Sequence, residues 1–386
     1  MIIDTKELIK NTNLTALEGG QNIEKILKIQ NKILIFLKNK SKTASEIERE
    51  LKLNGRTVRC ELLKLEQKKL VKKERGEKIS NKGICPNYWT INKIIEIIKT
   101  VPPSKVCLTY KTHHYSNFEK NHYSFFPSKI VLNEEKLAAI GVFEAEGSKT
   151  KYKGTEIVNC EPILINLFLD FLDDFKISKD KISFRIVFNK NILEKINTNK
   201  NELETNAEKF WRMKTGIRDE SKIRFNYTGN SWGVIRKNPK MYGSLNLNYN
   251  NVLFRKFLEL LIKKAKKRLI EKKEIIAYLS GFLAGEAYVG NHDREIQIAS
   301  IKVEELDLLQ ELLIKLNVLS SRSKKTSTSP PRVLITNLAS FIKLENYDIF
   351  KFHPDKRKAL IQKILNYKIL DQKLRLQLEN KMKKLK

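Results

Sequence analysis

The sequence has few cysteines, and they are widely spaced. Cys60, Cys85, Cys107 and Cys160 stand at none of the short spacings that metal-binding cysteine motifs use. This absence excludes a cysteine-based metal site of the zinc-finger kind. We expect reduced and partly buried thiols instead.

No stretch has the features of a membrane span or of a signal peptide. The longest apolar run, Ile275 to Val289, is too short to cross a bilayer and contains Glu286. The first ten residues carry Asp4 and Glu7 and lack the basic and then apolar order of a signal peptide. The sequence therefore predicts a cytoplasmic location and no membrane partner.

Acidic residues are also scarce relative to basic ones. Lys and Arg number 75 against 44 Asp and Glu, which gives a net charge of +31. Such a surface attracts polyanions, and without a membrane segment we expect nucleic acid rather than an acidic membrane. With 386 residues, the chain has room for two or three domains of about 150 residues each.

A short stretch occurs twice, as Ala139 to Gly147 and as Leu279 to Ala287. Each copy has small residues four positions apart, which lie on one face of a helix and allow another backbone to approach closely. We expect these two faces to pack against each other. The small residues are Gly141 and Ala145 in the first copy and Gly281 and Gly285 in the second.

The next-to-last residue of each copy is a carboxylate, Glu146 or Glu286, near the carboxyl end of its predicted helix. The helix macrodipole disfavours a negative charge at the carboxyl end of a helix, so we expect a compensating cation there. Two carboxylates held together favour a hard ion such as Mg²⁺, which can activate water and stabilise a leaving oxygen in phosphodiester cleavage. If only one copy were present, a buried contact between two helices with an acid at its edge would be enough to explain the motif.

Similar segments follow both copies, which indicates an internal repeat. A short alternating run, an apolar helix and a further strand come after each copy. In the first repeat they are Glu156 to Cys160, Ile163 to Phe175 and Ile182 to Phe188, and in the second they are Asp293 to Ile301, Val303 to Leu316 and Val333 to Thr336. An additional segment at about 189–270 lengthens the first repeat.

The N-terminal third has a different pattern. Residues 1–21 are polar and predict a loose arm. A helical pattern then begins at Asn22, Thr43 to Glu46 has the spacing of a capping box, and a basic helix is predicted from Arg56 to Lys69. Alternating segments at 70–75 and 87–91 complete an order that resembles the winged helix-turn-helix family, over residues 22–92.

That resemblance implies a DNA-binding surface. The helix from Arg56 would enter the major groove, while basic residues on the following strand would touch phosphate. The helix residues available for contact are Arg56, Thr57, Arg59 and Lys64, and the strand residues are Lys72, Lys73 and Arg75. The alternative is a protein-docking module with a basic, solvated face.

The repeated stretch itself resembles the motif of the LAGLIDADG homing endonucleases, in the single-chain form with two copies. The resemblance implies an α/β (α+β) fold of two αββα repeats that form a monomeric pseudo-dimer over double-stranded DNA. It places Glu146 and Glu286 at the metal-binding acids, with Mg²⁺ as cofactor, and Gly141, Ala145, Gly281 and Gly285 in the helix pair. Lys149 and Lys151 are the candidates for basic residues near the metal.

The sequence also departs from the motif. Both acids are Glu where the motif's name has Asp, the second copy ends in Ala287 rather than glycine, and a winged helix is not part of the basic enzyme. These departures leave open a DNA-binding regulator that no longer cuts, and also an RNA-binding maturase.

We predict a site-specific, Mg²⁺-dependent double-strand DNA endonuclease. The predicted domains are an arm at 1–21, a winged helix at 22–101, a first repeat with an insertion at 102–270, and a second repeat with a basic C-terminal helix at 271–386.

Overall fold

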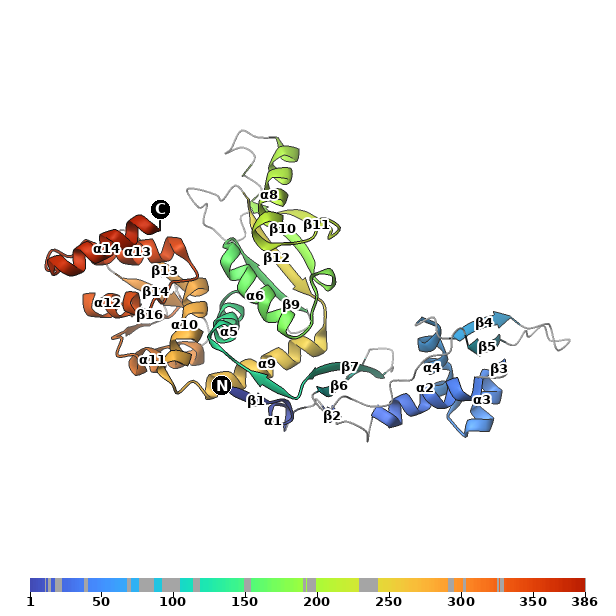
Figure 1. The fold of residues 1–386 in the computed structure, drawn as a ribbon. Helices are drawn as coiled ribbons and strands as arrows, with labels where there is room; N and C mark the ends of the chain where they lie inside the picture. The colour runs from blue at the N-terminus through green and yellow to red at the C-terminus, as the bar shows by residue number, and fades with distance from the viewer. Residues whose placement is uncertain are drawn as a thin grey trace. The chain divides into compact units, whose positions relative to one another are not determined.

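The computed structural model divides the chain into two compact units, one of Met1–Ile3 with Ile130–Lys386 and one of Asp4–Lys129 (Figure 1). Both mix helices with sheets, which confirms the α/β (α+β) fold class. The structure describes residues 1–10, 12, 15–17, 23–37, 41–67, 71–75, 87–91, 105–113, 119–148, 154–189, 192, 199–228, 242–290, 295–300, 303–324, 326 and 330–385.

Helices and a small sheet in the unit Asp4–Lys129 follow the predicted order. The helices are α2 (Ile23–Leu37), α3 (Ala44–Leu51) and α4 (Gly55–Gln67), and the strands are β3 (Lys42–Thr43), β4 (Val71–Arg75) and β5 (Asn87–Ile91). The strands pair in the antiparallel order β3-β5-β4. Their shared core consists of Ile33, Leu34, Leu37, Ile47, Val58, Leu62, Leu65 and Val71. Leu63 of α4 does not belong to this core and is exposed.

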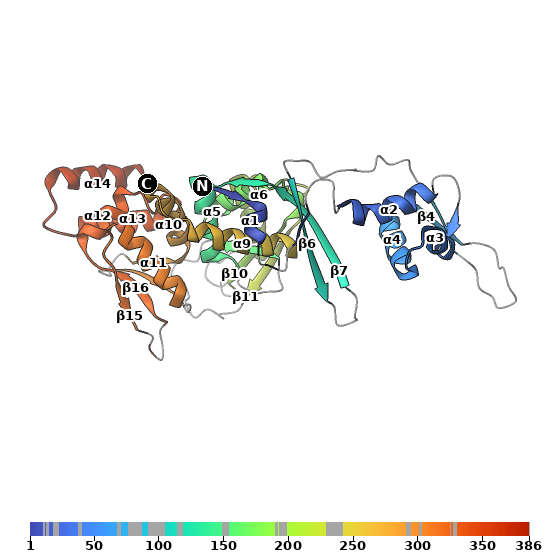
Figure 2. The ribbon, with the colours of Figure 1, turned by 90° about the horizontal axis from the view of Figure 1, so that it is seen from below.

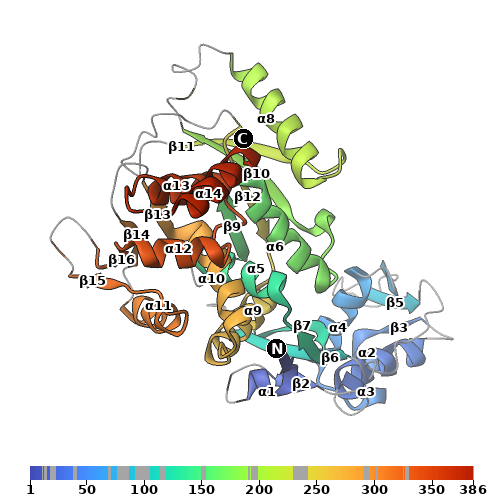
Figure 3. The ribbon, with the colours of Figure 1, turned by 60° about the vertical axis from the view of Figure 1, so that its left-hand side comes forward.

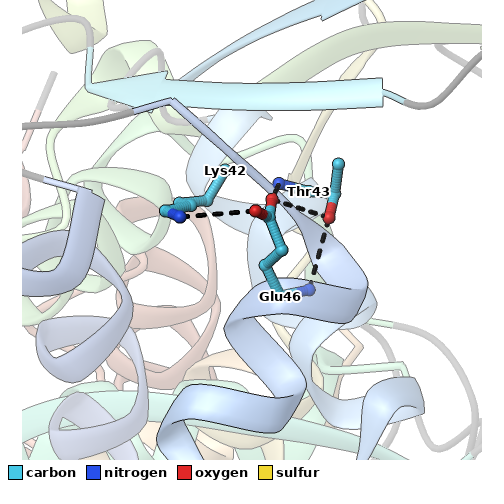
Figure 4. A network of polar contacts seen from close by, with 3 residues as sticks. All are labelled: Lys42, Thr43 and Glu46. Carbon is cyan, nitrogen blue, oxygen red and sulfur yellow. Dashed lines mark hydrogen bonds and ion pairs between the residues drawn. The ribbon is translucent and has the colours of Figure 1, made fainter.

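The start of α3 is fixed by the predicted capping box (Figure 4). The Glu46 amide donates to Thr43 Oγ1 at 3.3 Å, and the Thr43 amide donates to Glu46 Oε2 at 2.7 Å. Lys42 Nζ lies 3.3 Å from Glu46 Oε1. The hydrogen bond from the Thr43 backbone, with help from Lys42, holds the pKa of the Glu46 carboxyl below its usual value.

Replacing Glu46 by Ala is expected to lower the free energy of unfolding by roughly 0.5–1 kcal/mol at pH 7. A lowered pKa stabilises the fold at pH values above the pKa of the unfolded carboxyl, and this contribution is lost as the pH falls through the folded pKa. The difference in the free energy of unfolding between wild type and variant should therefore become smaller at acidic pH. Urea unfolding at several pH values measures it, with Glu50→Ala on the exposed face of α3 as the control; an equal loss in both variants would contradict the capping role.

The first residues are better ordered than the loose arm that the sequence predicts. The Met1 ammonium lies 3.3 Å from a carboxylate oxygen of Glu274, and it donates to the Leu132 carbonyl at 3.2 Å. Residues Ile2–Asp4 form β1, and the Asp4 side chain caps α1 (Thr5–Ile9). An ion pair and backbone hydrogen bonds therefore hold residues 1–4 in place. Strand β2 (Thr15–Leu17) joins β6 (Lys105–His113) and β7 (Glu119–Pro127) in a further sheet.

The unit that contains Ile130–Lys386 has the predicted internal repeat. A helix begins each half, α5 (Glu134–Glu146) or α10 (Lys272–Glu286), and a mixed region of strands and helices follows. The first half continues with β9 (Thr155–Asn159), α6 (Pro162–Asp174), β10 (Ser183–Asn189), β12 (Ser244–Tyr249) and α9 (Val252–Lys267). The second continues with β13 (Ala287–Val289), β14 (Ile296–Ala299), α11 (Val303–Lys315), β15 (Ser321–Ser323), β16 (Arg332–Ile335) and α12 (Leu338–Asn346).

The sheets of the two halves have related strand orders. The second sheet runs β13-β14-β16-β15, and the first runs β9-β12-β10 before ending in β11 (Ile223–Thr228). Gly147 bridges Ile157 of β9, at the place that β13 takes beside β14. Strands β9, β12 and β10 thus correspond to β14, β16 and β15. Both sheets lie toward the same side of this unit, and α6 and α14 lie toward the other (Figure 2).

This correspondence shortens the insertion in the first repeat. Strand β12 and helix α9 match β16 and α12, so they belong to the repeat although they fall within the segment 189–270. The inserted elements described by the structure are α8 (Lys200–Thr215) and β11, and α8 stands beside the β10–β11 edge (Figure 3). Sequence periodicity could not assign β12 to the first repeat, because its pairing partners, β9 and β10, are both distant in the chain.

Two helices end the chain, α13 (Pro354–Leu365) and α14 (Gln372–Lys384). Glu345 of α12 is only 3% exposed, and it receives Lys381 Nζ at 3.0 Å and an Arg357 guanidinium nitrogen at 3.4 Å. These contacts fasten both helices to the second repeat. Among the helices that the structure describes, none has the length and apolar character needed to cross a bilayer.

Candidate functional site

Helices α5 and α10 pack backbone against backbone, side by side in Figures 1 and 3. A Cβ atom added at Gly281 would clash with the Ala138 carbonyl group, lying 2.7 Å from its carbon. A Cβ at Gly141 would lie 2.7 Å from the Phe282 nitrogen. Side chains larger than a hydrogen atom do not fit at these crossings, so the glycines permit a contact that other residues would prevent.

The register of this contact shows that the helices run in the same direction. Ala138 meets Gly281 near the middle of the helices, and Ala145 meets Gly285 further along both chains. The carboxyl ends of α5 and α10 therefore lie together. A Cβ at Gly285 would be 2.6 Å from Ala145 Cβ and 3.2 Å from Glu146 Oε1. The Glu146 carboxylate consequently lies beside the residue that immediately precedes Glu286.

The two acids at this junction, Glu146 and Glu286, are both half-buried. Groups of three or more His, Cys, Asp or Glu side chains that could hold a metal are absent from the described residues. A transition-metal centre made wholly of protein ligands is therefore not found in that part of the chain. Mg²⁺ commonly binds through one or two carboxylates and completes its shell with water and phosphate oxygens. Two carboxylates at negative helix ends fit such an ion.

A lysine from α13 supplies the cation expected at a helix end. Lys356 Nζ donates to the carbonyls of Ala284 at 2.6 Å and Gly285 at 2.7 Å, and Leu283 O lies 3.4 Å away. The ammonium satisfies carbonyls that have no partner within α10, and it offsets the partial negative charge there. It thereby fixes the last turn before Glu286.

Replacing Lys356 by Met should lower the free energy of unfolding by about 2 kcal/mol, because charge-assisted bonds to the α10 carbonyls are lost. Met keeps most of the side-chain volume. Urea unfolding checks the effect, with Lys358→Met on the same helix as the control. Equal unfolding midpoints for the two variants would show that the ammonium does not stabilise α10.

Glu144, which sequence reasoning did not select, forms a second polar cluster on the helix pair. It accepts a hydrogen bond from the Tyr278 hydroxyl at 2.6 Å and pairs with Lys266 of α9. Burial, together with the Glu144 carboxylate, raises the pKa of Tyr278 well above its usual range. The position equivalent to Glu144 in the second copy is Ala284, so comparing the two copies does not point to Glu144. The signal that could have identified it is the presence of an acid within an apolar helix.

Polar side chains also cover one face of each sheet. In β10, Phe184, Ile186 and Phe188 are buried, while Ser183 and Arg185 on the opposite face are exposed. Such alternation is typical of a sheet with one solvated face. In the second sheet, Tyr288 is exposed and Arg332 donates to Gln297 Oε1 at 2.6 Å. Sequence reasoning did not single out these residues, although the alternation of 182–188 was visible.

The predicted contact residues of the N-terminal region are placed on α4 and β4. Arg56, Arg59 and Lys64 are exposed on α4, and Thr57 is half-buried. Lys64 pairs with Glu61 on the same helix. Lys72 and Lys73 are exposed on β4, which also contains Arg75. Lys149 and Lys151 lie outside the described residues.

Two repeats that share a parallel pair of glycine-containing helices define the class of fold to which the LAGLIDADG proteins belong. Residues 273–347, which run from α10 to the end of α12, match the family model of the LAGLIDADG-like domain. The match is limited to this segment, and there the resemblance seen in the sequence is confirmed. The match includes the second copy of the motif with Gly281, Gly285 and Glu286.

The solved structures that match the chain are distant in sequence and have low TM-scores. A structure of mesophilic variants of the homing endonuclease I-DmoI has 14% identity and a TM-score of 0.34, and the match covers 56% of this chain and 96% of that chain. I-DmoI in complex with DNA and Mn has 15% identity and a TM-score of 0.33, covering 56% and 98%. Full-length DUF199/WhiA from Thermatoga maritima has 10% identity and a TM-score of 0.32, covering 65% and 68%. The chain has no match among curated proteins.

Proposed function

We propose that this protein is a site-specific double-strand DNA endonuclease of the homing type, which uses a divalent ion, Mg²⁺, at Glu146 and Glu286. The observation that supports the proposal is the parallel pairing of α5 and α10, which brings the Glu146 carboxylate next to Gly285, the residue before Glu286. The LAGLIDADG-like match over 273–347 includes one of these acids. The net charge of +31 supports a polyanionic substrate.

The chain's own residues have separable tasks in this proposal. Gly141 and Gly281 let the helices approach, and this approach brings Glu146 next to the turn that carries Glu286. The carboxylates would hold the divalent ion, which when bound supplies an activated water and stabilises the leaving oxygen. The polar faces of the two sheets would bind the duplex, so that the two repeats address its two halves.

We propose the domain organisation on the same basis. Residues 22–101 would act as a winged helix, supported by the order of α2, β3, α3, α4 and the β4–β5 pair. Exposed Arg56 and Arg59 on α4 would then contact the major groove. The repeats at 102–270 and 271–386 would form a pseudo-dimer within one monomeric chain in the cytoplasm.

Selection from a random duplex pool tests the proposal. The purified chain is expected to enrich one sequence family, and to cut it in Mg²⁺ but not in EDTA. Parallel reactions with Mn²⁺ and Ca²⁺ identify the ions that support cutting. Binding of an enriched duplex without any product under every divalent ion would contradict the endonuclease.

The second candidate is a DNA-binding regulator that does not cut. Exposed basic side chains on α4 and β4 favour it, because these could bind duplex DNA without the two acids. Such a protein would show tight, salt-sensitive binding and no cleavage. In direct competition, a preference for structured RNA over duplex DNA would indicate the maturase instead.

A further inference from the structure

The first repeat carries a strand that has no counterpart among the described residues of the second. Strand β11 lies beside β10, whereas β15, the equivalent of β10, is the edge strand of its sheet. Strands β10 and β11 are parallel and are connected through α8, which is the arrangement of a β-α-β crossover. The insertion therefore widens the first sheet rather than adding a separate domain.

Helix α8 packs on one face of the added strand, while Arg224 and Thr228 are exposed on the other, which we call the open face. Tyr227 of β11 donates to Glu204 of α8 at 2.9 Å and stacks on Phe188 with 5.4 Å between ring centroids. Burial and the bond to Glu204 raise the pKa of Tyr227 to about 12. Trp211 of α8 is fully buried and donates to the Tyr242 carbonyl at 2.8 Å. These contacts make β11 a fixed part of the sheet.

The open face brings two arginines directly opposite each other. Arg185 of β10 is in register with Arg224 of β11, and with Asn246 on the other neighbouring strand. Both arginines are exposed, and neither side chain makes a hydrogen bond or an ion pair with any residue that the structure describes. Like charges opposite each other on neighbouring strands destabilise a sheet. A polyanion on this face would offset that repulsion, and it would find Asn226 and Thr228 on the same side of β11.

We propose that β11 extends the DNA contact surface of the first repeat, with Arg185 and Arg224 as the contacting residues. Adjacent strands are about 4.8 Å apart and successive base pairs about 3.4 Å, so one more strand reaches roughly one to two further base pairs. The protein then contacts the bound duplex asymmetrically, and the first repeat contacts more base pairs than the second. This inference rests on the duplex binding included in the proposed function.

Hydroxyl-radical footprinting of Arg224→Ala on the selected duplex tests the inference. The variant is expected to lose protection over the outermost one to two base pairs at one end only, and to bind roughly tenfold more weakly. If the guanidinium binds phosphate, the salt dependence of the variant's binding constant should correspond to about one phosphate contact fewer than in the wild type. Arg185→Ala should shift the same end of the footprint.

Lys214→Ala is the matched control, because this exposed lysine lies on α8 of the same insertion but not on the open face of the sheet. It should keep the wild-type footprint. Circular dichroism confirms that each variant is folded. A wild-type footprint for Arg224→Ala, or an equal loss for Lys214→Ala, would overturn the inference while duplex binding stands. If the wild type enriches no duplex, the proposed function fails, and the inference fails with it.

Discussion

Replacing Glu286 by Gln is expected to abolish cleavage of the selected duplex and to leave binding within a few-fold of wild type. Gln keeps the shape of the side chain but removes the charge that would hold a divalent ion. Loss of such a ligand removes several kcal/mol of transition-state stabilisation, and each 1.36 kcal/mol is a factor of ten in rate. We therefore expect cleavage to slow by roughly three orders of magnitude, measured by single-turnover assays alongside binding titrations.

Glu146→Gln should have an effect of the same size, because its carboxylate lies beside the residue before Glu286. Glu134→Gln is the control, since this acid lies at the opposite end of α5 and is exposed. Neutralising it should leave the cleavage rate unchanged. Cutting by Glu286→Gln at the wild-type rate would reject the assignment of the metal site.

Replacing Gly281 by Ala is expected to have the largest effect on stability. The added methyl group would collide with the Ala138 backbone, which can move only if the helices separate. Overpacking of this kind costs about 3 kcal/mol, even after the gain of about 1 kcal/mol that Ala brings to a helix interior. Gly141→Ala should behave similarly, because its methyl group also meets backbone atoms.

Two further glycine variants serve as comparisons. At Gly285 the added atom meets the side chains of Ala145 and Glu146, so we expect a smaller loss. At Gly55, the first residue of α4, the three atoms nearest to the added one belong to the Glu48 carboxyl group, which can swing away. Urea unfolding ranks the four variants, and a loss for Gly55→Ala as large as that for Gly281→Ala would contradict the packing explanation.

The helix pair was predictable because its signal is local. Small residues four apart occupy one helical face whatever the surroundings, and the second copy identified the partner. The capping box at Thr43 was predictable for the same reason, since both of its hydrogen bonds join residues three positions apart. Such patterns determine an element and the face that it buries.

Lys356 illustrates what a local pattern omits. The sequence indicated that a cation should offset the end of α10, but more than 70 positions separate this lysine from the carbonyls that it binds. Many lysines were candidates in so basic a chain. Only the packing of α13 against α10 selected one of them.

By itself, the sequence determined the order of the helices and strands from α2 to β5, the repeated helix motif and the two acids, because periodicity and capping depend on neighbours in the chain. The tertiary structure decided the strand order, the true extent of the insertion and the pairing of Arg185 with Arg224. Alternating segments specify a strand but not its neighbour, since every strand offers the same backbone bonds. The hydrogen bond from Tyr227 of β11 to Glu204 of α8, and the stacking of Tyr227 on Phe188 of β10, fix that neighbour in the folded chain.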